Sequence, residues 1–273
     1  MENKNIVLLQ HSPLKIHFDN PFYANQVENI NDYVVIDGTS RVERDKEFMK
    51  QHPTFSQDLS PFFIGPVMSS DGVEAKVFEI FWQFGKVYPC HDNHGKPNEA
   101  FFSWRNSFYA LDKCSKDLMR HACKDLHYKH EDARYFAYFD YENNTYVPLN
   151  YVEAIKKVYF VEYAKLVYST PSFQFLKSLV DANQKIALID FDGFNYHYEK
   201  ALVRKYESYL KKCKDNKITP SKTLNDYLKL TTMKDVVNCP FLKVGHGFVI
   251  KALLQGDLKV IDGQVVDKTG ILE

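Results

Sequence analysis

The sequence predicts an α+β fold that is mainly helical and has only a few short strands. Three observations support this class. The stretch 77–88 is apolar around most of a helical wheel, and two later segments begin with residues typical of helix starts. The expected strands are scattered, without the alternation of strand and helix that builds a doubly wound sheet. Hydrophobic residues make up 45% of the 273 positions, which is enough for a large core.

The first part of the chain, up to about residue 60, combines short strands with one charged helix. The expected elements are strands at 5–10, 14–18 and 32–36 and a helix at 41–52. Pro53 ends that helix because proline cannot continue a helical interior. We expect this N-terminal extension to pack on a mainly helical core at about 61–260, so that residues 1–273 form a single domain.

The apolar helix expected at 77–88 carries one narrow polar stripe. Glu79, Gln83 and Lys86 are spaced at i, i+4 and i+7, which places them on the same face. An unpaired carboxylate on a buried helix is costly, so the stripe must reach water or line a cavity. It is therefore either the wall of a pocket or the thin solvated edge of a core helix.

The second half of the chain contains the clearer helix starts. Asn150 and Glu153 have the spacing of a capping box, and Thr170 with Pro171 has the pattern of an N-cap followed by a first-turn proline. Asp262 and the glycine after it predict the turn of a hairpin at 258–266. Further elements are expected as helices at 100–110, 113–128, 198–212, 223–230 and 248–254 and a buried strand at 186–190.

Composition excludes several functional classes. The 35 basic and 35 acidic residues balance, so we expect no broad basic surface for nucleic acid and no attraction to a membrane. The five cysteines are odd in number and include no Cys-x-x-Cys pair, which indicates reduced thiols. We expect a cytoplasmic protein, in the host cytoplasm if a phage encodes it. Cys90, His91 and His94 match no zinc spacing, and neither a metal site nor a cofactor is expected.

Asp190 and Asp192 alternate at the end of the strand expected at 186–190, so both carboxylates point to the same side. Such a pair can hold a divalent cation or divide acid and base roles. The Asp-x-Asp-Gly sequence also resembles the opening motif of haloacid-dehalogenase-like phosphatases, in which the first Asp attacks phosphate and the second donates a proton. The alternative is an ordinary junction between a strand and a turn.

Two further segments offer groups that could bind phosphate. The backbone N–H groups around His246, between two glycines at a helix start, favour an anion, although a hinge before a core helix is the alternative. Asp37, Ser40 and Arg41 follow a strand and supply a carboxylate, a hydroxyl and a guanidinium. The alternative for these three is a surface turn with a salt-bridged arginine.

The order of these motifs resembles an uncharacterised domain family of bacteria and phages, over most of the chain from about residue 33. The motifs are Ile36-Asp37-x-Thr39-Ser40-Arg41, Ser60-Pro61-Phe62, Glu79-x-x-Trp82-Gln83-x-x-Lys86-Val87, Tyr151-x-Glu153-Ala154-x-Lys156-Lys157-x-Tyr159, Ala187-Leu188-Ile189-Asp190 and a late His246. More distantly, the pattern is similar to NADAR proteins. In those, a strand with Asp-Gly leads to a helix carrying a Glu and a Gln four residues apart, as Asp71-Gly72, Glu79 and Gln83 do here.

The resemblance implies a compact, NADAR-like helical domain that hydrolyses N-glycosidic bonds. The implied substrates are ADP-ribose attached to guanine, in a nucleotide or in DNA, and related nucleotide-derived compounds such as early riboflavin intermediates. Cleavage builds positive charge on the ribose, which a fixed carboxylate stabilises. Glu79 is expected to be that carboxylate, with Asp190 or Asp192 as its acid partner and Gln83 orienting water or a ribose hydroxyl.

The remaining residues of the string are expected to bind substrate. Phosphate binding is assigned to Arg41, Lys86 and Lys157, and Trp82 would stack on a base unless it belongs to the core. The other expected substrate-binding residues are Asp37, Ser40, Tyr151 and His246.

Two alternative functions stay open. A non-catalytic nucleotide-binding or phage host-interaction module of the same fold would bind nucleotide without turnover. An Asp-x-Asp phosphatase would require Mg²⁺ and would lose phosphate release in Asp190→Asn.

Overall fold

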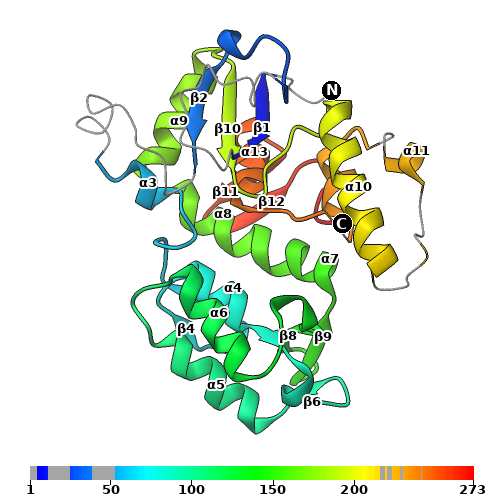
Figure 1. Ribbon diagram of the computed structural model, residues 1–273. Helices are drawn as coiled ribbons and strands as arrows, with labels where there is room; N and C mark the ends of the chain where they lie inside the picture. The colour runs from blue at the N-terminus through cyan, green and yellow to red at the C-terminus, as the bar shows by residue number, and fades with distance from the viewer. Residues whose placement is uncertain are drawn as a thin grey trace. The chain divides into compact units, whose positions relative to one another are not determined.

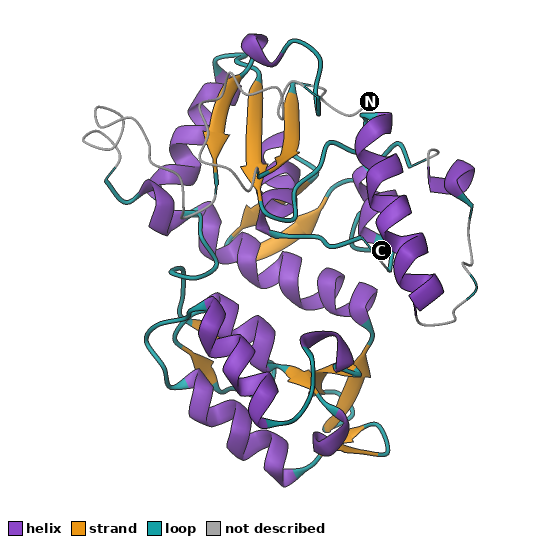
Figure 2. Ribbon diagram, viewed as in Figure 1, coloured by secondary structure: helices purple, strands orange, loops and turns teal. Residues whose placement is uncertain are grey.

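The structure, a computed structural model, divides into two compact units (Figure 1). Unit 1 comprises Met1–Leu59 with Val167–Glu273, and unit 2 comprises Ser60–Leu166. The residues described are 5–11, 25–38, 53–215, 219, 223–227, 230–240 and 242–273. Both units mix helices with small sheets (Figure 2), which confirms the predicted α+β class. Within the described residues, no helix has the length and apolar character needed to cross a bilayer.

Unit 1 is built on a parallel sheet of three strands (Figure 1). The strand β10 (Ile186–Asp190) lies between β1 (Ile6–Gln10) and β2 (Val34–Asp37). All five residues of β10 are buried, as is typical of a strand with both neighbours parallel and both faces covered. The helix α13 (His246–Gln255) packs on β1 and β10.

Unit 1 also contains further helices and a hairpin. They are α3 (Phe55–Asp58), α9 (Pro171–Asp181), α10 (Glu199–Asp215), α11 (Leu224–Tyr227), α12 (Met233–Val237), β11 (Leu258–Ile261) and β12 (Gln264–Asp267). The β11–β12 hairpin turns at Asp262, as predicted. Thr170 accepts a hydrogen bond from the backbone of Phe173 and starts α9, which also confirms the sequence prediction.

Unit 2 has an aromatic core around the helix α4 (Phe78–Phe84). Phe78 packs edge-on against Tyr159 and Tyr163, and Trp82 stacks on Phe136 at 5.3 Å. The other helices are α5 (Glu99–Tyr109), α6 (Lys116–Asp125), α7 (Tyr151–Ala154), a π-helical turn (Ile155–Tyr159) and α8 (Phe160–Tyr168), which runs past the unit boundary. Asn150 and Glu153 form the predicted capping box at the start of α7.

The strands of unit 2 are short and antiparallel. They are β3 (Val67–Met68) with β4 (Glu74–Ala75), β5 (Lys86–Val87) with β8 (Tyr135–Asp140) and β9 (Thr145–Leu149), and β6 (Asp92–Asn93) with β7 (Lys96–Pro97).

The helix expected at 77–88 is shorter than predicted. It ends at Phe84, and Lys86 and Val87 instead pair with β8. Gly85 makes this close pairing possible, because a Cβ there would lie 2.4 Å from Cζ of Phe136. The backbone N–H of Ala137 also donates to the carbonyl of Gly85. Pairing with a strand about fifty residues later therefore overrides the local helical pattern.

Unit 1 combines two distant segments of the chain, which the sequence did not predict. The first segment of unit 1 ends at Leu59. The segment from Val167 onward joins the N-terminal segment because it supplies the strand between β1 and β2. The strand predicted at 14–18 and the helix at 41–52 lie outside the described residues. The prediction of a single domain stays a prediction, because the compactness of each unit does not test it.

Candidate functional site

The predicted polar stripe of unit 2 exists as a chain of hydrogen bonds, which we call the Glu79 cluster: Glu79, Gln83, Lys86 and His130. The side-chain amide of Gln83 donates to Oε1 of Glu79 at 2.7 Å. Lys86 Nζ donates to Oε1 of Gln83 at 2.5 Å, and Nε2 of His130 lies 2.5 Å from the same oxygen. Glu79, Gln83 and Lys86 are half-buried.

This arrangement fixes the direction of the Gln83 amide. A lysine ammonium can only donate, so the atom that Lys86 contacts must be the oxygen, and the amide nitrogen must face Glu79. Nε2 of His130 is also 3.1 Å from Lys86 Nζ. It can donate to Gln83 when it carries a proton and accept from Lys86 when it does not. The cluster therefore joins a carboxylate to a titratable group through one oriented amide.

Cys114 is a neighbour of this cluster that the sequence did not indicate. Burial, together with a smaller effect of the negative charge of Glu79, raises the pKa of its thiol to about 12. Cys114 is therefore a neutral thiol at physiological pH.

A groove of about 730 Å³ lies along α6 and the segment that follows it. Its lining is mainly cationic and aromatic: Met119, Arg120, Cys123, Lys124, His127, Tyr128, Lys129 and His130. Among these described residues none carries a carboxylate, but Asp117 forms an ion pair with Arg120 at 2.9 Å, so the positive charge that favours an anion in the groove comes mainly from Lys124 and Lys129. His130 belongs to both the groove and the Glu79 cluster. The sequence signal for the groove was the i, i+4 spacing of Arg120 and Lys124.

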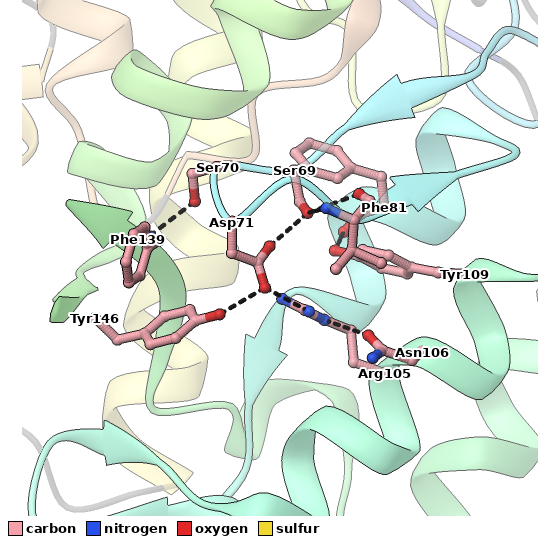
Figure 3. A network of polar contacts seen from close by, with 10 residues as sticks. Ser69, Ser70, Asp71, Phe81, Arg105, Asn106, Tyr109, Phe139 and Tyr146 are labelled. Carbon is pink, nitrogen blue, oxygen red and sulfur yellow. Dashed lines mark hydrogen bonds and ion pairs between the residues drawn. The ribbon is translucent and has the colours of Figure 1, made fainter. Parts of the chain in front are cut away.

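The Asp-Gly turn before α4 holds a buried ion pair (Figure 3). Asp71 accepts hydrogen bonds from Arg105 at 2.6 Å, from the hydroxyl of Tyr146 at 2.5 Å and from the hydroxyl of Ser69 at 2.5 Å. Burial alone would raise the pKa of the Asp71 carboxyl, but these hydrogen bonds outweigh it and lower that pKa. The side chain of Arg105 is 3% exposed, so the network joins the β3–β4 turn to α5 and β9 as a structural element.

The other predicted residues of unit 2 are either buried in the core or exposed at the surface. Trp82 is 7% exposed and lies between Phe136 and Tyr159, with Lys86 Nζ 5.1 Å from its ring centroid. This supports the alternative that Trp82 belongs to the core, because little of its area could stack on a base. Tyr151 and Lys157 are exposed on the segment of α7 and the π-helical turn.

A second cluster in unit 1 surrounds Asp190, which ends the central strand β10 and is 2% exposed. Its Oδ2 accepts the backbone N–H of Gly247 at 2.8 Å, and its Oδ1 lies 3.3 Å from Nδ1 of His246. Nε2 of His246 is 3.1 Å from the carbonyl oxygen of Gly38, just after β2. Both ring nitrogens thus face acceptors, and only the protonated ring can donate to both.

The glycines around His246 are explained by this close approach. A Cβ at position 245 would lie 2.7 Å from Oδ2 of Asp190, and one at position 247 would lie 2.9 Å from the same atom. The start of α13 therefore already holds an anion, the carboxylate of Asp190. The helix start that we expected to attract phosphate has this carboxylate on the N–H of Gly247.

Asp192 is half-buried beside this cluster. Burial raises the pKa of its carboxyl, the charge of Asp190 raises it further, and Lys243, Lys205 and His246 oppose the shift. Two neighbouring carboxyl groups with different environments are a recurrent source of an acid. Asp37, at the end of β2, is 3% exposed. Ser40 and Arg41 lie outside the described residues.

The predicted residues therefore fall into two groups. Glu79, Gln83, Lys86 and their neighbours belong to unit 2, and Asp37, Asp190, Asp192 and His246 belong to unit 1. Within each group the structure brings polar side chains together. No set of three or more metal-binding side chains comes together among the described residues. No protein-family model, curated protein or solved structure matches the chain.

Proposed function

We propose that the chain is a NADAR-type N-glycoside hydrolase that cleaves the ribose–base bond of an ADP-ribosylated, guanine-type base or a related nucleotide-derived compound. The observation that carries this proposal is the Glu79 cluster, in which Gln83 orients a half-buried carboxylate. The NADAR-like fold is part of the same proposal, and the Asp71-Gly72 turn before α4 supports it.

The chemistry requires a fixed negative charge. As the bond between ribose and base breaks, positive charge develops on the sugar ring, and a carboxylate in a partly dehydrated site stabilises it. The amide of Gln83 holds the carboxylate of Glu79 in one orientation before substrate arrives, which lowers the cost of reorganisation. His130 supplies a titratable donor in the same cluster, suited to protonating the leaving base.

The groove along α6 suits the rest of the proposed substrate. Its volume of about 730 Å³ lies within the usual range of about 300–1,000 Å³ for small-molecule sites. Arg120, Lys124 and Lys129 would face a diphosphate, and Tyr128 offers a ring for stacking. In this proposal the phosphates therefore contact residues on and after α6 instead of Arg41 and Lys157. Asp190 and Asp192 belong to unit 1, and the proposed reaction does not depend on them.

The test is release of ADP-ribose from a guanine-ADP-ribosylated oligonucleotide. We expect wild-type protein to release it and Glu79→Gln to be slower by about 10²–10³-fold, since a fixed charge at the reaction centre is lost. Glu99→Gln is the matched control, because Glu99 is an exposed glutamate of the same unit on α5. Wild-type protein that leaves this conjugate and riboflavin intermediates intact would contradict the proposal.

The groove alone also favours the second candidate, a non-catalytic nucleotide-binding module, because its cations do not depend on Glu79. Calorimetry with ADP-ribose separates the two functions. Binding by both wild-type protein and Glu79→Gln, with no turnover by either, identifies the module. The phosphatase alternative receives less support, because the carboxylate of Asp190 is buried and bonded to α13 rather than presented to a ligand.

A further inference from the structure

We propose that unit 1 contains a separate site for a phosphate or phosphoryl group, beside the carboxyl end of strand β1. A cavity of about 180 Å³ lies there. Its lining combines residues from the end of β1, the segment after β10 and the helix α10: Gln10, Gln26, Phe194, Arg204, Lys205 and Ser208. This site goes beyond the proposed glycosidase function, whose residues in unit 2 it does not include.

The position of the cavity follows from the sheet topology. Gln10 is the last residue of β1 and pairs in register with Asp190, the last residue of β10. Phe194 comes shortly after β10 and is buried. In parallel sheets, ligands bind outside the carboxyl ends of the strands, where the connections diverge. The cavity lies at this edge of the sheet.

One wall of the cavity is preorganised by a buried amide. Gln26 is 2% exposed, its Oε1 accepts the backbone N–H of Gln10 at 2.7 Å, and its Nε2 donates to the carbonyl of Gln10 at 3.2 Å. The side chain thus extends the hydrogen-bond ladder of β1 by one step. A buried side chain held by two bonds offers a rigid wall to a ligand, which reduces the entropy lost on binding.

The lining residues from α10 supply positive charge. Arg204 and Ser208 are four residues apart on α10, so they lie on one face, and Lys205 is adjacent. The ammonium of Lys205 is 5.3 Å from the centroid of Phe194, which places it beside the cavity. Among the described lining residues there are two cations and no carboxylate. A guanidinium binds phosphate through two parallel N–H bonds, and a serine hydroxyl adds a third donor.

The volume of the cavity favours a small anion. With about 30 Å³ for each water in the liquid, a cavity of about 180 Å³ replaces roughly six waters. That is enough for a phosphate ion or a phosphoryl head group, but it is below the range of about 300 Å³ and more for sites that enclose a whole drug-sized ligand. The site is therefore expected to hold the phosphoryl group and leave any attached organic part outside.

Calorimetric titration of the full chain with inorganic phosphate tests the site. Ser208→Asp places a negative charge on the wall at an exposed helix position, and we expect it to weaken phosphate binding by about 10–100-fold. Ser208→Asn, with similar size and no charge, should retain binding within about threefold. Lys205→Gln should weaken it comparably to Ser208→Asp, whereas Lys211→Gln, an exposed lysine of the same helix, should not.

The groove of unit 2 is also cationic, so the experiment includes Arg120→Gln with Lys124→Gln. Retention of phosphate binding in that double variant supports the separate site. Phosphate binding that is lost there and unchanged in Ser208→Asp would overturn it, as would the absence of any binding at millimolar phosphate. A parallel titration with ribose 5-phosphate identifies the source: tighter binding than inorganic phosphate assigns the site to a phosphorylated metabolite, and equal binding assigns it to the free ion.

Discussion

At the scale of single residues, Asp71 shows how the chain holds a buried charge. Three donors converge on its carboxylate, and the opposing guanidinium of Arg105 is enclosed by the rings of Phe101, Phe102 and Tyr109 at 5.2–5.6 Å. Such a pair need not add much net stability, but removing one partner leaves an uncompensated charge. The same carboxylate belongs to the Asp-Gly turn that precedes the Glu79 cluster.

We expect Asp71→Asn to lower the free energy of unfolding by about 3–5 kcal/mol at neutral pH, because Arg105 stays buried without its carboxylate. Urea denaturation followed by circular dichroism measures the loss. The double variant Asp71→Asn with Arg105→Met should recover part of it, since it removes the stranded charge. Equal stability of the single variant and wild type would refute this account.

The same residue predicts a dependence on acid. The pKa of Asp71 is lower in the folded chain than in the unfolded one, so its contribution is fully present above the unfolded value of about 4. It is lost as the pH falls through the folded value. The stability difference between wild type and Asp71→Asn should therefore shrink below about pH 4.

Which residues would join the Glu79 cluster was only partly predictable. The i, i+4 spacing of Glu79 and Gln83 placed both on one face, and the structure confirms their contact. His130 could not be found this way, because it meets Gln83 across 47 positions of sequence. Contacts of that range depend on how strands and helices pack, and periodicity carries no information about them.

At the scale of elements, the start of α13 is shaped by the strand beneath it. Gly247 lets the helix approach so closely that a Cβ would lie 2.6 Å from Cδ1 of Leu8 and 2.9 Å from Cβ of Asp190. The sequence indicated a glycine-flanked helix start, but the pattern did not show that a carboxylate from the same chain would occupy it. Helix starts at Asn150 and Thr170 were predictable because their capping partners lie three residues away.

Gly247→Ala should destabilise the protein by about 1–3 kcal/mol, because the added methyl group pushes α13 away from Leu8 and Asp190. This sign is opposite to that of an ordinary glycine-to-alanine change within a helix, where alanine is favoured by about 1 kcal/mol. Thermal unfolding gives the sign directly. A higher thermal unfolding midpoint for Gly247→Ala than for wild type would mean that the added methyl group fits between α13 and the sheet.

At the scale of the whole molecule, the two units differ in how the chain builds them. Unit 2 is continuous in sequence, whereas unit 1 is assembled from two segments that flank it. The predicted class, α+β with few strands, rested on composition and local pattern and is confirmed. The parallel sheet was not predicted, because β10 reads alone as one buried strand and its partners lie far away in sequence.

A fragment of residues 60–168, which keeps α8 whole, should fold alone and unfold cooperatively in urea, because its sheets and aromatic core use only residues within it. A fragment of residues 1–59 should stay unfolded, because β1 and β2 would lack the strand between them. Circular dichroism of both fragments provides the measurement. A non-cooperative transition in the longer fragment would show that it depends on the rest of the chain.

The placement of β10 also bears on synthesis. The ribosome makes β1 and β2 first, but the strand that pairs with both emerges only after Ile186 has been added. Until then two apolar strand edges have no native partner, and such edges are where nascent chains aggregate. The intervening unit can complete its own contacts during that interval. We therefore expect the nascent chain to be most prone to aggregation before Ile186–Asp190 has been made.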